Sequence, residues 1–136
     1  MSKAAATRSA AVIAAVGLAA GLLGGGIATS RATSPAAPAG REIVLFARDM
    51  AYFLPGDPRP NPTLAVARGE TVRVVLINRD AGMEHDFAVP ALGAASALVA
   101  GRGSAAVTFR APGERGDHEY LCTLHAVVMR GALIVR

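Results

Sequence analysis

The residues best suited to metal chemistry lie near the end of the chain, within residues 119–131. This segment holds the only cysteine, Cys122, followed by His125 three residues later and by Met129 four residues after that. A second histidine, His85, precedes the cysteine by 37 residues. One thiolate, two imidazoles and a thioether are the donors of a mononuclear copper site with a weak axial methionine. The pattern therefore predicts a metal site with these four residues as candidate ligands.

Each candidate also has an ordinary structural interpretation. A free cysteine is most often a small buried hydrophobe, and a methionine often fills a gap in a core. Cys122 ends an expected strand, so a turn after it can bring His125 back to the same point. His118 is the third histidine, but it lies four residues before Cys122, which is ~13 Å along an extended strand. That separation is too long for a shared metal, which leaves His85 as the second imidazole.

The elements that must position these residues are predicted to be short strands. The strand patterns cover residues 42–47, 63–67, 71–77, 84–89, 104–110, 117–122 and 132–136. Turn signals separate them, including four prolines in residues 54–62, whereas residues 91–103 are weakly patterned. Seven or eight strands at spacings of about ten residues predict an all-β fold, an antiparallel Greek-key sandwich or barrel.

The first forty residues have a different character. After the basic residues Lys3 and Arg8, residues 10–28 carry no charge. Such a run is typical of an export signal, and it is also just long enough for a membrane anchor. The expected parts are a signal peptide or anchor (1–30), a flexible linker (31–40) and a folded domain (41–136). Export would place the domain in the periplasm or on the outer face of the cytoplasmic membrane of a bacterium.

Charge and cysteine content exclude some classes of protein. The net charge of the chain is +4, but residues 41–136 hold eleven arginines against ten acidic residues. The folded part is therefore almost neutral and has no nucleic-acid footprint. A single cysteine cannot form an intramolecular disulfide. In an exported protein a free thiol is open to oxidation, which favours a ligand role for Cys122.

The sequence from Tyr120 to Val135 resembles the C-terminal copper loop of the cupredoxins, the family of plastocyanin, pseudoazurin and amicyanin. That loop reads Cys-x2-His, then a gap of two to four residues, then Met-x-Gly and a final apolar strand, as does Met129-x-Gly131 here. The region of His85 also resembles the first-ligand region of cytochrome oxidase subunit II, but that dinuclear centre needs two cysteines. The resemblance covers about residues 41–136. It implies one copper ion per chain, bound by His85, Cys122, His125 and axial Met129.

Asp86 stands where the cupredoxins commonly have an asparagine that ties the two ligand loops together. An aspartate there is expected to accept hydrogen bonds from the Cys122 loop, with Thr123 as the natural donor. Its negative charge is expected to favour Cu(II) and to lower the reduction potential.

The resemblance further implies a monomeric shuttle of single electrons, and not an enzyme. The expected partner is a cytochrome or an oxidase, reached through the surface around His125, with contact to a membrane only if the N-terminal segment stays uncleaved. Ala126, Val127 and Val128 would form an apolar rim there, although ordinary loop packing explains them equally well. Two other functions stay open: a periplasmic carrier that supplies copper for oxidase assembly, and a metal-free or zinc-binding module.

Overall fold

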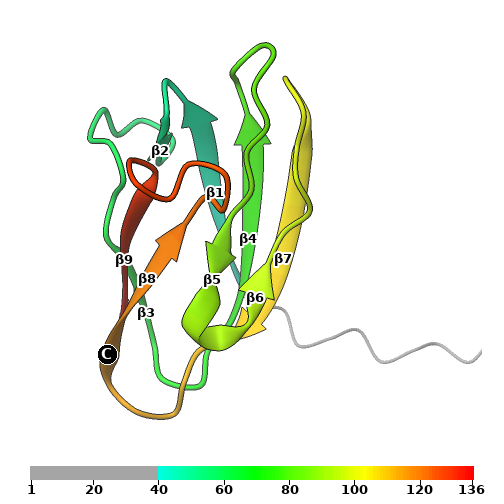
Figure 1. The fold of residues 1–136 in the computed structure, drawn as a ribbon. Helices are drawn as coiled ribbons and strands as arrows, with labels where there is room; N and C mark the ends of the chain where they lie inside the picture. The colour runs from blue at the N-terminus through cyan, green and yellow to red at the C-terminus, as the bar shows by residue number, and fades with distance from the viewer. Residues whose placement is uncertain (1–39) are drawn as a thin grey trace, which may run out of the picture. The chain divides into compact units, whose positions relative to one another are not determined.

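The computed structural model of the chain describes residues 40–136, so the expected signal or anchor and nearly all of the expected linker lie outside the described residues (Figure 1). The described part contains nine strands and one short 3-10 turn. They are β1 (Arg41–Arg48), β2 (Ala51–Phe53), β3 (Leu64–Val66), β4 (Thr71–Asn78), β5 (Ala88–Val89), η1 (Pro90–Leu92), β6 (Ala94–Ala95), β7 (Ser104–Arg110), β8 (Gly116–Leu121) and β9 (Arg130–Val135). Within these residues, no helix is long and apolar enough to cross a membrane.

The strands form two sheets, one with the order β2-β1-β4-β7 and the other with the order β3-β9-β8-β5-β6. The predicted all-β sandwich is confirmed, and the loops after β4 and β8 lie toward the same end of it (Figure 1). Two strand pairs depart from the expected antiparallel arrangement, because β1 pairs with β4 and β3 pairs with β9 in parallel. Between β1 and β4 the chain crosses to the other sheet to make β3. That crossover lets the two neighbours run in the same direction.

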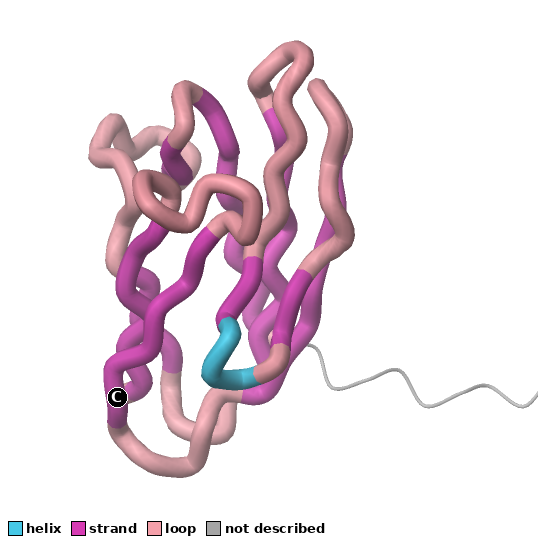
Figure 2. The backbone as a smooth tube through the Cα atoms, viewed as in Figure 1, coloured by secondary structure: helices cyan, strands magenta, loops and turns pink. Residues whose placement is uncertain are grey.

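The strand boundaries differ from the predicted ones mainly around the first candidate ligand. The predicted strand at residues 84–89 is reduced to β5, and His85 instead forms a single bridge with Val99. Figure 2 shows the long loop stretches before β5 and after β6. The short strands β2 and β6 were not predicted, because two or three residues are too few to show an alternating pattern. β4, by contrast, alternates clearly: Val72, Val74 and Leu76 are buried.

Three aromatic side chains, Tyr52, Phe87 and Tyr120, pack together in the core and are fully buried. The ring centroids of Phe87 and Tyr120 are 5.2 Å apart, and those of Tyr52 and Tyr120 are 5.4 Å apart. The Tyr52 hydroxyl donates to the backbone carbonyl of Asp86, and the Tyr120 hydroxyl donates to that of Pro62. Burial raises the pKa of both hydroxyls, so both remain donors at neutral pH. The two hydroxyls therefore fix the backbone next to His85 and that of the proline-rich loop between β2 and β3.

Gly131 of β9 faces Tyr120 of β8 across the ladder, and we expect Gly131→Ala to destabilise the domain. A Cβ atom at residue 131 would lie 2.6 Å from Tyr120 Cε1 and closer still to the end of that ring. The ring cannot retreat, because it is buried and its hydroxyl is bonded to Pro62. We expect a loss of about 2 kcal/mol in the free energy of unfolding, measured by urea denaturation.

Gly113→Ala is the matched control, because a Cβ atom there would have no neighbour within 4 Å. Equal stability of the two variants would show that the close approach of Gly131 to Tyr120 is not a constraint.

Candidate metal centre

The loop between β8 and β9 carries three of the four candidate ligands, and its own backbone closes it. Cys122 N donates to Met129 O (3.0 Å), and Met129 N donates to His125 O (2.9 Å). His125 N donates in turn to Cys122 O (3.1 Å). These bonds fold the segment into consecutive turns directly after strand β8. The loop therefore returns to β9 with Cys122 and Met129 both fully buried.

His85 comes from the loop after β4, and Asn78 at the end of β4 holds that loop in place. The Asn78 side-chain amide donates to the carbonyls of Met83 (2.7 Å) and Val99 (2.9 Å). His85 and Val99 exchange two backbone hydrogen bonds, of 3.1 and 2.8 Å. His85 is completely buried, although it lies between the acidic residues Glu84 and Asp86 in the sequence.

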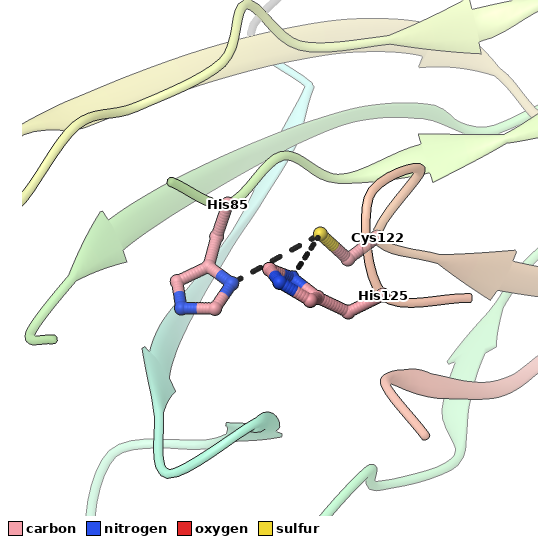
Figure 3. A group of neighbouring side chains, drawn as sticks. All are labelled: His85, Cys122 and His125. Atoms are coloured by element: carbon pink, nitrogen blue, oxygen red, sulfur yellow. Dashed lines mark hydrogen bonds between the residues drawn. The ribbon is translucent and has the colours of Figure 1, made fainter. Parts of the chain in front are cut away.

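Figure 3 shows the rings of His85 and His125 directed toward the Cys122 sulfur. Nδ1 of His85 is 4.0 Å from Cys122 Sγ, and Nδ1 of His125 is 3.5 Å from it. All three atoms lie within 4.8 Å of one another. A nitrogen and a sulfur bound to one metal ion in a trigonal plane are about 3.7 Å apart, given bonds of about 2.0 and 2.3 Å. The three side chains are thus spaced as a metal site requires, and a soft thiolate with two imidazoles suits copper or zinc.

Met129 and His118, the other two side chains considered as donors, have different placements. Met129 is buried at the end of the loop between β8 and β9. Its role as an axial ligand stays a prediction. His118 lies in β8, half-buried, and is not part of the cluster formed by the other two histidines and the cysteine.

Asp86 connects the two loops through Thr123, as the sequence predicts. Its Oδ1 accepts a hydrogen bond from Thr123 N, and its Oδ2 accepts one from Thr123 Oγ1, both of 2.7 Å. The carboxylate is buried, and two bonds to its oxygens offset the cost of removing it from water. The residue after His85 is therefore joined directly to the residue after Cys122.

Asp80 is a functional candidate that the sequence did not reveal. Its Oδ2 lies 2.9 Å from His85 Nε2, and its Oδ1 accepts a hydrogen bond from Asp49 N (3.0 Å). A carboxylate at Nε2 favours the tautomer that carries its proton there, which leaves Nδ1 free to face Cys122. The only signal in the sequence is an acidic residue five positions before His85, and such a residue is common in any polar turn.

Asn61 is a second residue that the sequence did not reveal, and its side chain holds the loop between β8 and β9 from outside. Asn61 has a positive φ of 50°, which asparagine tolerates better than most residues. Its Oδ1 accepts from Tyr52 N (3.0 Å), and its Nδ2 donates to Val128 O (2.9 Å). The proline-rich loop is thus connected to the residue before Met129.

Burial raises the pKa of the Cys122 thiol. Hydrogen bonds from the backbone at Asp86, Leu124 and His125 act in the opposite direction. The sulfur is thus buried, and backbone N–H groups beside it partly offset the effect of that burial on its pKa. A bound cation would add the positive charge that thiolate formation requires.

The surface around His125 is apolar. His125 is half-buried, whereas the side chains of Leu124, Val127 and Val128 are 53%, 89% and 50% exposed. Val127 and Val128 therefore do not pack within the loop, while Ala126 is half-buried. Leu124 belongs to this exposed group, although the sequence did not single it out. We call Leu124, Val127 and Val128 the apolar rim.

Comparison with known proteins identifies the fold. No protein-family model matches the chain, and neither does any curated protein sequence. Among solved structures, the chain is similar to auracyanin A, described as a "blue" copper protein from Chloroflexus aurantiacus, with 21% identity over 70% of this chain and 98% of that one (TM-score 0.57). It is also similar to auracyanin from Roseiflexus castenholzii (19% identity, 71% and 97% of the chains, TM-score 0.58) and to auracyanin B (20%, 76% and 93%, TM-score 0.59). The described domain thus has the cupredoxin fold that the sequence resemblance implied. Its His-Cys-His cluster lies where the two predicted ligand loops meet.

We expect metal-free protein to hold neutral His85 as a single tautomer with its proton on Nε2, because Asp80 accepts that hydrogen bond. Long-range 1H–15N NMR of the imidazole nitrogens would show this tautomer. Asp80→Ala should produce a mixture of tautomers, and Asp80→Asn should restore the single one through its amide oxygen.

Asp117→Ala, an exposed change in β8, is the control for the loss of one carboxylate. If Asp80→Ala left the tautomer unchanged, the contact with Asp80 would not determine the orientation of the ring.

Proposed function

We propose that this domain binds one copper ion through His85, Cys122, His125 and axial Met129, and that it carries single electrons between redox partners. The observation that carries the proposal is the convergence of one buried cysteine sulfur and two imidazole Nδ1 atoms from separate loops. The cupredoxin fold supports it, because the auracyanins that share the fold include a "blue" copper protein.

A copper ion bound there would supply a one-electron couple, and the residues of this chain would keep its surroundings nearly constant. Cu(I) and Cu(II) prefer different geometries, so a site that cannot rearrange favours fast transfer. Three connections oppose rearrangement: Asp80 to His85, Asp86 to Thr123, and Asn61 to Val128. Asp80 thus holds His85 from within its own loop, Asp86 joins the two ligand loops, and Asn61 holds the second loop from outside it.

Electron exchange through the apolar rim is the expected route to a partner, because His125 is half-buried there beside exposed leucine and valine side chains. An apolar patch of this kind suits a brief contact at the small end of interface sizes. A cytochrome or an oxidase is the kind of partner that we propose. Support for a monomer comes from the family resemblance.

Export of the domain is part of the proposal and rests on the sequence. The uncharged run at residues 10–28 after a short basic segment supports export to the periplasm or to the outer face of the cytoplasmic membrane. A lone cysteine in that compartment would be protected from oxidation by burial and by metal coordination. The domain is proposed to act without catalysis, since the four ligands would leave no open position for a substrate.

The visible spectrum tests the proposal. Addition of Cu(II) to the full chain should give an intense thiolate-to-copper band at one copper ion per chain, bleached reversibly by ascorbate. Cys122→Ser should abolish the band, because the thiolate produces it. His118→Asn is the matched control and should leave it intact, since His118 lies outside the cluster.

A colourless protein that binds Cu(I) or Zn²⁺ would contradict the electron-carrier proposal. It would favour copper delivery in the first case and a structural metal site in the second.

Asp86→Asn is expected to raise the reduction potential of the copper-loaded protein. Asparagine can keep both contacts with Thr123, because its amide oxygen accepts from the backbone and its amide nitrogen donates to the hydroxyl. The substitution therefore removes mainly the charge. Loss of about 1 kcal/mol of preference for Cu(II) corresponds to about 40 mV in a one-electron couple.

Potentiometric titration of both proteins gives the measurement. Asp117→Asn removes an equal charge from the exposed far end of β8 and should change the potential much less. A potential that is unchanged in Asp86→Asn would exclude the Asp86 charge as a determinant.

A further inference from the structure

An Arg-Asp dipeptide stands at the end of each of the parallel strands β1 and β4: Arg48-Asp49 begins at the last residue of β1, and Arg79-Asp80 directly follows β4. Their register pairs Ala47 with Asn78, so Arg48-Asp49 continues beside Arg79-Asp80. Asp49 N donates to Asp80 Oδ1 (3.0 Å), which locks the two chain segments together just beyond the strands. Asp49 and Asp80 are thus joined by a hydrogen bond. The strand register also places Arg48 beside Arg79.

Both arginines are stacked on phenylalanine rings. The guanidinium carbon of Arg79 is 3.5 Å from the centre of the Phe46 ring, and that of Arg48 is 4.2 Å from the centre of the Phe53 ring. The arginine–carboxylate ion pairs within residues 40–136 include neither guanidinium. Stacking restricts the long side chains without neutralising them, so less conformational entropy is lost when they bind a carboxylate.

The two stacked pairs line a groove of about 290 Å³. Its walls are Phe46, Arg48, Phe53, Leu54, Gly56, Asp57, Pro58 and Arg79, which we call the arginine groove. Asp57 is the acidic residue among them, and its carboxylate is already paired with Arg59 (2.7 Å). That hydrogen-bonded pair lowers the pKa of Asp57 to about 2, so its charge is engaged with Arg59 across the physiological pH range. The groove therefore offers apolar walls and two unpaired positive charges.

The arginine groove is connected to the candidate metal centre by two consecutive residues, Arg79 and Asp80. Arg79 precedes Asp80, whose carboxylate contacts His85 Nε2 (2.9 Å). None of the residues of the apolar rim lines the groove. A partner seated in it would thus reach the site from the side of His85, through a single hydrogen-bonded residue, and not from the side of His125.

We propose that the arginine groove is a second docking surface, which takes an acidic segment of a redox partner with an apolar side chain between its carboxylates. Charge complementarity with Arg48 and Arg79 selects the carboxylates, and the phenylalanine walls accept the apolar group. Arginine and aromatic residues are also the types that dominate binding energy at interfaces. The identity of the partner as a redox protein rests on the proposed function, whereas the chemistry of the groove does not.

A small peptide probe tests the docking chemistry. We would titrate the 15N-labelled full chain with the peptide acetyl-Glu-Phe-Glu-amide and follow the backbone amide shifts. The shifts should concentrate on Arg48, Phe53, Leu54, Gly56 and Arg79, and they should weaken with added salt. The neutral peptide acetyl-Gln-Phe-Gln-amide should bind about fivefold more weakly.

The variant Arg48→Gln/Arg79→Gln should reduce the affinity for the acidic peptide by about fivefold, through the loss of two exposed charge contacts. Arg68→Gln/Arg115→Gln is the matched control, because it removes the same charge from exposed arginines outside the groove. Equal affinities of the two double variants, or shifts spread over the whole surface, would overturn the proposal. This experiment needs no metal, so its result is independent of whether the chain binds copper.

Oxidation of the copper-loaded chain tests the redox part. One electron passes from Cu(I) to hexacyanoferrate(III), which gives Cu(II) and hexacyanoferrate(II) with no transfer of atoms. The anionic oxidant should react about threefold more slowly with Arg48→Gln/Arg79→Gln than with Arg68→Gln/Arg115→Gln. Equal rates would show that the groove is not an approach for electrons, even if it binds the peptide.

Discussion

The arrangement of the whole site depends on a buried carboxylate, Asp86. Its two hydrogen bonds to Thr123 join the loop that carries His85 to the loop that carries Cys122. A buried charge is costly unless its lone pairs are satisfied, so the two loops are stable only in the position where these bonds form. The Tyr52 hydroxyl adds a bond to the carbonyl of the same residue. The position of the site is therefore fixed by polar contacts, while the apolar core supplies the surrounding stability.

The sequence predicted the fold and the principal side chains of the site because both leave periodic or compositional signals. β4 alternates between buried and exposed positions, and the segment from Cys122 to Met129 has a spacing that few other sites require. The contact of Asp86 with Thr123 was also predicted, because Asp86 stands where the cupredoxins commonly have an asparagine that joins the two ligand loops. Asp80 and Asn61 could not be found in this way. Their roles come from turns that bring them to His85 and Val128, and a turn fixes such contacts without a repeating pattern in the residue types.

The parallel direction of two strand pairs was also not predicted, for a different reason. Alternation in sequence shows which face of a strand is buried, but it does not show the direction of its neighbour. The direction of β4 beside β1 is set by the passage of the chain through β3 in the other sheet. The same parallel register brings the two Arg-Asp pairs level. A topological feature that the sequence pattern does not contain thus creates both the contact between Asp49 and Asp80 and the groove beside it.

The separation of the ligands along the chain has a consequence for folding. His85 and Cys122 are 37 residues apart, and β5, β6, β7 and β8 all form between them. Closing so long a loop is entropically costly, so contacts of this kind arise late, after the intervening strands have paired. His85 therefore joins the other three donors only in a chain whose two sheets are already assembled. An ion that needs all of them would bind the completed domain and not its precursors, and its capture would select against partly folded molecules.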